Sequence, residues 1–155
     1  MLIRSLEATM KSSLILLMLL ALSHVAFSDD HGVNKGLTLE KRQADAVMSV
    51  TNVDLGNDVT TISAKGQMGV YGTVYVTYNL TYNASRTSGF VTSQGRGAVD
   101  KDTVAAGASR GIWTRDGSIV KIRQVVQISD GSQNLDIIDI DMLKDTFIIK
   151  AFSLK

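Results

Sequence analysis

The fold is decided by the stretch GTVYVTYNLTY, residues 72–82. Apolar or aromatic side chains at every second position alternate with more polar ones, which is the pattern of a β-strand with one buried face. β-Branched and aromatic residues are also the types that strands favour. The residues expected on the inward face are Val74, Val76, Tyr78, Leu80 and Tyr82.

The same alternation continues backwards from this stretch to residue 62. An unbroken strand over residues 60–82 would be about 75 Å long at roughly 3.3 Å per residue, which is too long for a small domain. The chain must therefore bend near Gly66, Gly69 or Gly72, because glycine tolerates kinks and bulges. A two-residue hairpin would swap the inward face, whereas a kink or a turn of odd length would keep it. We expect the kink or the odd-length turn.

Four turn signals divide the C-terminal half: Lys101-Asp102, Asp116-Gly117, Asp130-Gly131 and Lys144-Asp145. Asp-Gly is typical of a type I′ hairpin, in which both central residues need positive φ. Four short hairpins predict five antiparallel strands, at about 89–99, 103–115, 118–128, 133–142 and 146–154. Three further strands are expected at about 46–53, 59–70 and 72–83. About eight strands joined by tight turns predict an all-β protein, an antiparallel up-and-down barrel without exposed edges.

Two-residue turns would also set the register of the strands. In that register Trp113 lies opposite Phe90 on one side and Val120 on the other. The adjacent Ile137 and Ile138 cannot both point inward on a regular strand, so we expect a bulge there. The predicted core face comprises Phe90, Trp113, Val120, Ile122, Val126, Ile128, Leu135, Ile137, Ile138, Ile140, Met142, Phe147 and Ile149.

Polar residues interrupt this apolar face. A buried Arg needs partners, because an unpaired buried charge costs several kcal/mol. One interpretation is a ligand cavity in which a few fixed polar groups orient a mostly apolar ligand. The alternatives are a solvated barrel rim or a register that is wrong by one residue. The predicted ligand-binding residues are Gln94, Arg96, Ser109, Trp113 and Gln124.

The N-terminal residues have the pattern of an export signal. Lys11 precedes an apolar run over residues 14–22, and Ala26 and Ser28 fit the small-residue cleavage rule. The alternative is an uncleaved membrane anchor, but the run is shorter than the roughly 20 residues that a spanning helix needs. Met10 is an alternative start to Met1. We therefore expect a signal peptide at residues 1–28 and a secreted or periplasmic protein.

Residues 29–43 are polar and aperiodic, which predicts a flexible lead before a β-barrel domain at 44–155. Lys41-Arg42 in this lead is either a dibasic processing site or an ordinary solvated pair. Ile148, Phe152 and Leu154 would lie on the outward face of the last strand. They suit either a homodimer contact or packing beneath the lead.

The composition excludes several classes of site. The chain has no Cys, and after residue 43 it has no His and no Glu. Hydrolase centres of the Ser-His-Asp or Cys-His kind and the usual zinc sites are therefore absent from the domain, and we expect no catalytic residue, metal or cofactor. After removal of residues 1–28 the chain holds equal numbers of basic and acidic residues, so we expect no binding to nucleic acid or anionic membranes.

The glycine spacing resembles that of the allene oxide cyclase and dirigent barrel superfamily. The residues concerned are Lys65 to Gly72, Ser88-Gly89, Gly95-Arg96-Gly97 and Gly107 to Gly111, within about residues 58–115. The resemblance implies an eight-stranded barrel and an apolar ligand. The acidic pocket residues of dirigent proteins have no counterpart, since Asp100 and Asp102 fall in a turn. No catalytic residue is therefore carried over from that family.

Three classes of function fit the sequence. The first is an exported, non-catalytic barrel that binds a small apolar ligand or a protein partner. The second is an isomerase or cyclase that works without a nucleophile. The third is an eight-stranded outer-membrane barrel with its apolar face turned to lipid. Short turns at both ends and a single Trp favour the first class.

Overall fold

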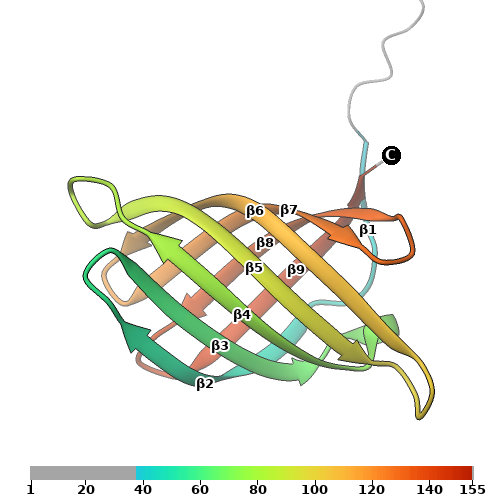
Figure 1. Cartoon of the computed structure of the whole chain (residues 1–155). Coiled ribbons are helices and arrows are strands. Elements are labelled where there is room, and N and C mark those ends of the chain that lie inside the picture. Colours follow the sequence, from blue (N-terminus) through green and yellow to red (C-terminus); the bar gives the residue numbers. More distant parts are fainter. Residues whose placement is uncertain (1–37, 155) are drawn as a thin grey trace, which may run out of the picture. The chain divides into compact units, whose positions relative to one another are not determined.

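The computed structural model describes residues 38–154, and these form an all-β domain (Figure 1). The proposed signal peptide and most of the proposed lead lie outside the described residues. One short 3-10 helix, η1 (Gly69–Tyr71), interrupts the strands. The strands are β1 (Leu39–Lys41), β2 (Ala46–Leu55), β3 (Val59–Gln67), β4 (Thr73–Thr81), β5 (Ser88–Ala98), β6 (Val104–Asp116), β7 (Ile119–Ile128), β8 (Gln133–Asp141) and β9 (Thr146–Leu154).

The sheet closes on itself as an up-and-down barrel. Strands β2 to β9 pair in sequence order, each antiparallel to the next, and β9 also pairs with β2 over Ala46–Ser49. This last pairing confirms the predicted eight-stranded barrel. β1 adds a ninth strand that was not expected, with Leu39 opposite Leu154 of β9. The lead predicted for residues 29–43 is therefore strand in part.

The two residues of the dibasic pair lie at the end of β1. Lys41 pairs with Phe152 of β9, and its ammonium lies 2.9 Å from the carboxylate of Asp45. The backbone N–H of Arg42 donates to the carbonyl of Ala151, and the Arg42 Nε is buried. Lys41 is exposed and Arg42 is half-buried, so the structure leaves both the processing site and the solvated pair as predictions.

Residues 72–82 behave as the alternation predicted. Val74, Val76, Tyr78 and Leu80 of β4 are all buried. β3 and β4 are joined by the loop of residues 68–72, whose odd length keeps the apolar residues of both strands inside the barrel. Gly69 and Gly72 in this loop have φ values of 50° and 67°, a region that favours glycine. The odd-length turn is confirmed.

The register of β5 against β6 differs by one residue from the prediction. Phe90 lies opposite Ile112, and Gly89 takes the place opposite Trp113. The cause is the loop at residues 99–103, where the Asp100 carboxylate accepts hydrogen bonds from two backbone N–H groups, and the strands therefore start to pair one residue later. Phe90 faces outward and is 73% exposed, so its placement in the core was wrong.

The register of β7 against β8 also differs by one residue. Val126 pairs with Asn134 instead of Leu135, because the turn contains Gly131 at φ 85° and is one residue longer than a two-residue hairpin. β8 therefore runs without the bulge that was predicted at residues 137–138. Leu135 and Ile137 are only half-buried, whereas Asn134 and Asp136 point inward together with Ile138 and Ile140.

The two remaining hairpins are shifted by two residues, which preserves the inward faces. Trp113 pairs with Ile122, and Ile140 pairs with Phe147. The middle of the barrel is filled by large buried side chains, among them Ile122, Phe147 and Tyr78. The rings of Tyr78 and Phe147 lie 5.1 Å apart.

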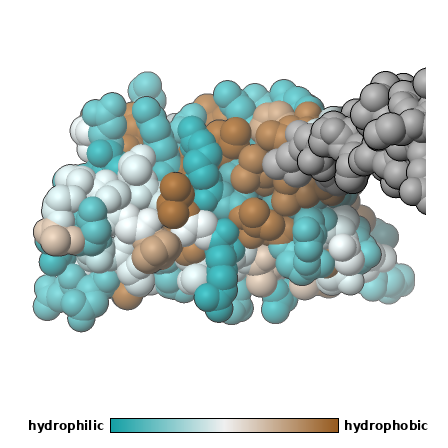
Figure 2. Space-filling model, turned by 90° about the horizontal axis from the view of Figure 1, so that it is seen from above, coloured by the Kyte–Doolittle hydropathy of each residue, from teal (hydrophilic) through white to brown (hydrophobic). Residues whose placement is uncertain are grey.

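The outer surface exposes apolar side chains on several strands. Figure 2 shows apolar residues interspersed with hydrophilic ones on one face of the molecule. Ile148 of β9 is 39% exposed, while Phe152 and Leu154 are half-buried beside β1. The homodimer contact suggested for these residues stays a prediction.

Candidate functional site

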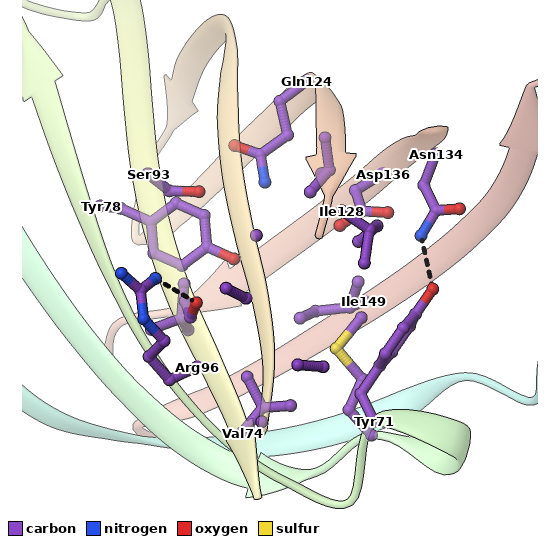
Figure 3. A pocket seen from close by; sticks show the side chains of 18 residues that line it. Tyr71, Val74, Tyr78, Ser93, Arg96, Gln124, Ile128, Asn134, Asp136 and Ile149 are labelled. Carbon is purple, nitrogen blue, oxygen red and sulfur yellow. Dashed lines mark hydrogen bonds between the residues drawn. The ribbon is translucent and has the colours of Figure 1, made fainter. Parts of the chain in front are cut away.

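Two cavities of the described barrel lie at its opposite ends. The larger, of about 510 Å³, opens beside the β4–β5 loop and the β6–β7 turn, and we call it the mouth pocket. The smaller, of about 70 Å³, lies at the opposite end beside η1, and we call it the inner cavity (Figure 3). The packed side chains of Ile122 and Phe147 lie between the residues of the two cavities.

The mouth pocket has an apolar floor and an aromatic wall. Buried Ile62, Leu80 and Val120 line it, because the alternation of β3, β4 and β7 turns them inward. The rings of Tyr82 and Trp113 meet edge to face with centroids 5.7 Å apart. Such a surface suits an apolar ligand, because aromatic side chains offer large contact areas.

Polar groups of the mouth pocket lie near its rim. The guanidinium of Arg86 lies over the Tyr82 ring, 4.4 Å from its centroid, as in a cation–π contact. The Tyr82 hydroxyl is hydrogen-bonded to the Thr60 hydroxyl. Arg115 also lines the pocket and is exposed. These groups can orient a ligand, while the floor contributes affinity through burial.

The inner cavity contains a chain of hydrogen-bonded polar side chains. Ser93 and Ser109 hydroxyls lie 2.6 Å apart, and the Ser109 hydroxyl donates to Gln124 Oε1 at 2.7 Å. Gln124 lies directly across from Asp136 in the register of β7 against β8. The polar side chains therefore follow one another across four strands, from β5 through β6 and β7 to β8.

Asp136 is the charged member of this chain and is only 4% exposed. Burial raises the pKa of its carboxyl to about 7, while the hydrogen bond from Gln124 and the positive charge of Arg42 act to lower it. Its Oδ1 atom is buried and has no hydrogen-bond partner in the described part of the chain. Burial and the charge of Asp136 raise the pKa of the Tyr78 hydroxyl.

Asn134 forms the other polar wall of the inner cavity. Its side-chain amide donates to the Tyr71 hydroxyl at 3.4 Å, the contact drawn on the right of Figure 3. Its Oδ1 atom is buried and, within residues 38–154, has no donor. Two residues that line the inner cavity therefore each carry an acceptor oxygen that residues 38–154 leave unpaired.

The structure brings together only some of the residues that the sequence suggested. Ser109 and Gln124 are buried and bonded to each other near the inner cavity, but Trp113 lines the mouth pocket at the other end. Gln94 is exposed on the outer face of β5. Arg96 borders the inner cavity but is exposed, and its guanidinium donates to the Gly95 carbonyl at 2.8 Å. The one-residue shift of β5 explains both outward positions.

Sequence reasoning missed the buried residues of β8. The run NLDIIDID, residues 134–141, alternates polar and apolar side chains at its start, with Asn134 and Asp136 sharing one face with Ile138 and Ile140. That parity was the available signal. Leu135 and Ile137 on the opposite face compete with that parity, and the predicted bulge at residues 137–138 placed apolar residues of both faces in the core.

Neither metal-binding clusters nor spanning helices are found in the described part of the chain. Among residues 38–154 no three His, Cys, Asp or Glu side chains gather in a group that could hold a metal ion. No helix there is long and apolar enough to cross a membrane.

Comparison with protein families, curated proteins and solved structures finds no match to this chain.

Proposed function

We propose that this chain is an exported, non-catalytic barrel that binds a small, mostly apolar ligand in the mouth pocket. The observation that carries the proposal is the cavity of about 510 Å³, which lies within the range of roughly 300–1,000 Å³ typical of small-molecule sites. Its floor is apolar and its few polar groups lie near the rim. The floor can therefore supply affinity, while the polar groups orient the ligand.

The direction of the strand faces supports this proposal over an outer-membrane barrel. In the mouth pocket half of the molecule the apolar residues point inward, as Trp113 and Ile122 do at 3% and 0% exposure. The outer face carries the exposed cations Arg110, Lys121 and Arg123 on β6 and β7. Cations on a lipid-facing surface cost about 2–4 kcal/mol each near the bilayer midplane, which favours a barrel surrounded by water.

The test uses N-phenyl-1-naphthylamine, a neutral apolar dye that fluoresces in apolar surroundings and accepts energy from Trp. Trp113 is the only Trp and lines the mouth pocket, so bound dye should quench its emission. Met142→Lys places an ammonium in the pocket wall and should weaken dye binding at least tenfold. Leu143→Lys is the matched control, because Leu143 is 83% exposed and should leave binding unchanged.

Two results would refute the assignment of the mouth pocket. One is dye binding that leaves the Trp113 emission unchanged, and the other is equal affinity in the Met142→Lys and Leu143→Lys variants. Export is tested separately by the intact mass of the protein recovered from the medium or periplasm. A mass that retains residues 14–22 would refute cleavage of the signal peptide.

A further inference from the structure

The inner cavity is lined by buried polar side chains that an apolar ligand in the mouth pocket would not contact. Asn134 and Asp136 both line this cavity at 1% and 4% exposure, and the Oδ1 atom of each is buried without a hydrogen-bond donor from residues 38–154. Buried acceptors in folded proteins are nearly always satisfied, because an unmade hydrogen bond costs about 1–3 kcal/mol. Two such atoms in one cavity point to a ligand that donates hydrogen bonds.

Three of the neighbouring polar side chains are already engaged. Gln124 accepts from Ser109, the Asn134 amide donates to Tyr71, and the Arg96 guanidinium donates to the Gly95 carbonyl. Within residues 38–154 no Lys or Arg forms an ion pair with Asp136, the described ion pairs being Lys41–Asp45 and Lys144–Asp141. The charge of Arg42 acts on Asp136, but Arg42 makes neither a hydrogen bond nor an ion pair to it within residues 38–154. These side chains therefore leave Asp136 Oδ1 without a donor, and a positively charged ligand would compensate the carboxylate.

The size and walls of the cavity limit the donor. Its volume of about 70 Å³ accommodates on the order of five water-sized groups, at roughly 10–15 Å³ for each. Val74, Val126 and Ile128 supply apolar walls. A primary ammonium with a short alkyl tail matches both features: three N–H donors at one end and a few methylene groups at the other.

We propose that the inner cavity is a second binding site, which takes a small primary ammonium ion with its nitrogen at the carboxylate of Asp136 and its alkyl tail against the apolar walls. The site is independent of the mouth pocket, because buried Ile122 and Phe147 fill the barrel between them. An inorganic cation fits less well, since Ca²⁺ takes six to eight oxygen ligands and, within residues 38–154, the lining of this cavity offers two unpaired buried side-chain oxygens.

Binding of the ammonium should depend on pH. The titratable and charged groups that face Asp136 are Tyr78 on β4, Tyr71 on η1, Arg96 on β5 and Arg42 after β1, while β6, β7 and β9 contribute only uncharged lining residues. Because the carboxyl titrates near pH 7, its ionised form predominates above that pH. Affinity should rise between pH 6 and pH 8 and then level off, since a primary alkylamine stays protonated over this range.

The experiment is a titration of the purified protein with n-propylammonium chloride at pH 8, followed by the side-chain amide signals of Asn134 in NMR spectra. 1-Propanol, sodium propionate and potassium chloride at equal concentration test the neutral isostere, the anion and a bare cation. The proposal expects saturable shifts with propylammonium alone. Asp136→Asn should weaken this binding at least tenfold, because it removes the charge at nearly constant volume.

Asp139→Asn is the matched control. Asp139 lies on the same strand and also has a buried Oδ1 atom without a partner in residues 38–154, but it faces away from the cavity and should leave the affinity unchanged. Equal binding of 1-propanol or potassium, unchanged affinity in Asp136→Asn, or no binding of propylammonium would each overturn the proposal.

If Asp136→Asn does not fold, the titration of the Asp136 carboxyl carbon in the unaltered protein decides. Saturating propylammonium should lower its pKa, and an unchanged pKa refutes the site. Dye binding in the mouth pocket, measured in the same samples, separates failure of this site from failure of the proposed function.

Discussion

The indole Nε1 of Trp113 on β6 donates a hydrogen bond to the carbonyl of Thr81, the last residue of β4, at 2.8 Å. β5 lies between these two strands, so the bond passes over it. It does so at Gly89, where an added Cβ would overlap the Thr81 carbonyl and lie 3.0 Å from the indole nitrogen. Because Gly89 has no side chain, the indole ring of Trp113 can lie across β5 and form part of the wall of the mouth pocket.

Replacement of Trp113 by Ala should therefore destabilise the barrel severely. The side chain is 3% exposed, and removal of a buried aromatic residue costs roughly 3–5 kcal/mol, to which the lost hydrogen bond adds about 1 kcal/mol. Urea denaturation followed by circular dichroism measures the change. In the unaltered protein the Trp113 emission should be blue-shifted and resistant to iodide.

Trp113→Phe separates the two contributions. It keeps most of the ring volume but leaves the Thr81 carbonyl without its donor, so it should cost less than Trp113→Ala. A red-shifted emission, together with a small effect of both substitutions, would contradict the position of Trp113 inside the barrel.

The strand pattern was recoverable from the sequence because turn residues and alternation agree over most of the chain. The bounds of β4 and β9 were expected within two residues, and the inward face of β4 was expected correctly. The closed barrel followed from the short connections between strands of similar length. Turn residues and strand alternation are local features, so a short stretch of sequence is enough to recognise each of them.

The candidate sites were harder to predict because they depend on the lengths of two loops. The Asp100 carboxylate replaces backbone groups in the β5–β6 loop, and this one-residue shift exposes Gln94 and Arg96. In β8 the apolar residues Leu135 and Ile137 favoured the other parity, and the burial of a carboxylate also runs against the general physical expectation. Asp136 breaks that expectation, and exceptions of this kind concentrate at functional sites.

Buried Asp136 should make stability fall as pH rises. Its folded pKa of about 7 lies above the ordinary value of 3.8, so between these values the folded state binds more protons than the unfolded state. The contribution is fully present below about pH 4 and is lost as pH rises through 7. The loss is of the order of 4 kcal/mol at most, at 1.36 kcal/mol for each pH unit.

Thermal unfolding between pH 5 and pH 8 measures this dependence. Asp136→Asn should flatten the profile and raise the melting temperature at pH 8, because it removes a buried charge. Asp139→Asn should keep the slope of the unaltered protein. A profile that rises with pH in this window would mean that Asp136 is compensated in the folded state.

The hydrogen bonds that Ser109 makes beside the inner cavity should stabilise the barrel. This residue is 6% exposed and bonds both Ser93 and Gln124. Ser109→Ala should cost about 1–3 kcal/mol, because it leaves the Gln124 carbonyl oxygen without this donor in the interior. Ser129→Ala is a useful comparison, since Ser129 is exposed and its hydroxyl accepts a hydrogen bond only from the backbone N–H of Ala106 among its described contacts. Similar free energies of unfolding for the two variants would show that water replaces the lost partner.

Gly111 on β6 should tolerate no side chain, whereas Gly95 on β5 should. A Cβ at Gly111 would overlap the Arg123 carbonyl and lie 2.6 Å from the Cα of Gln124, so β6 and β7 would have to move apart. A Cβ at Gly95 would meet nothing closer than 3.5 Å. Gly111→Ala should therefore lower the free energy of unfolding by about 1–3 kcal/mol or more.

Gly95→Ala is the control and should change stability by less than about 1 kcal/mol in either direction, since it also restricts the unfolded chain. Urea denaturation of both variants measures the difference. Because Gly111 pairs with Gln124, its substitution should also displace the Gln124 amide from Asp136 and weaken propylammonium binding, which Gly95→Ala should not do. Equal stability of the two variants would refute the register of β6 against β7, and with it the position of Gln124 in the inner cavity.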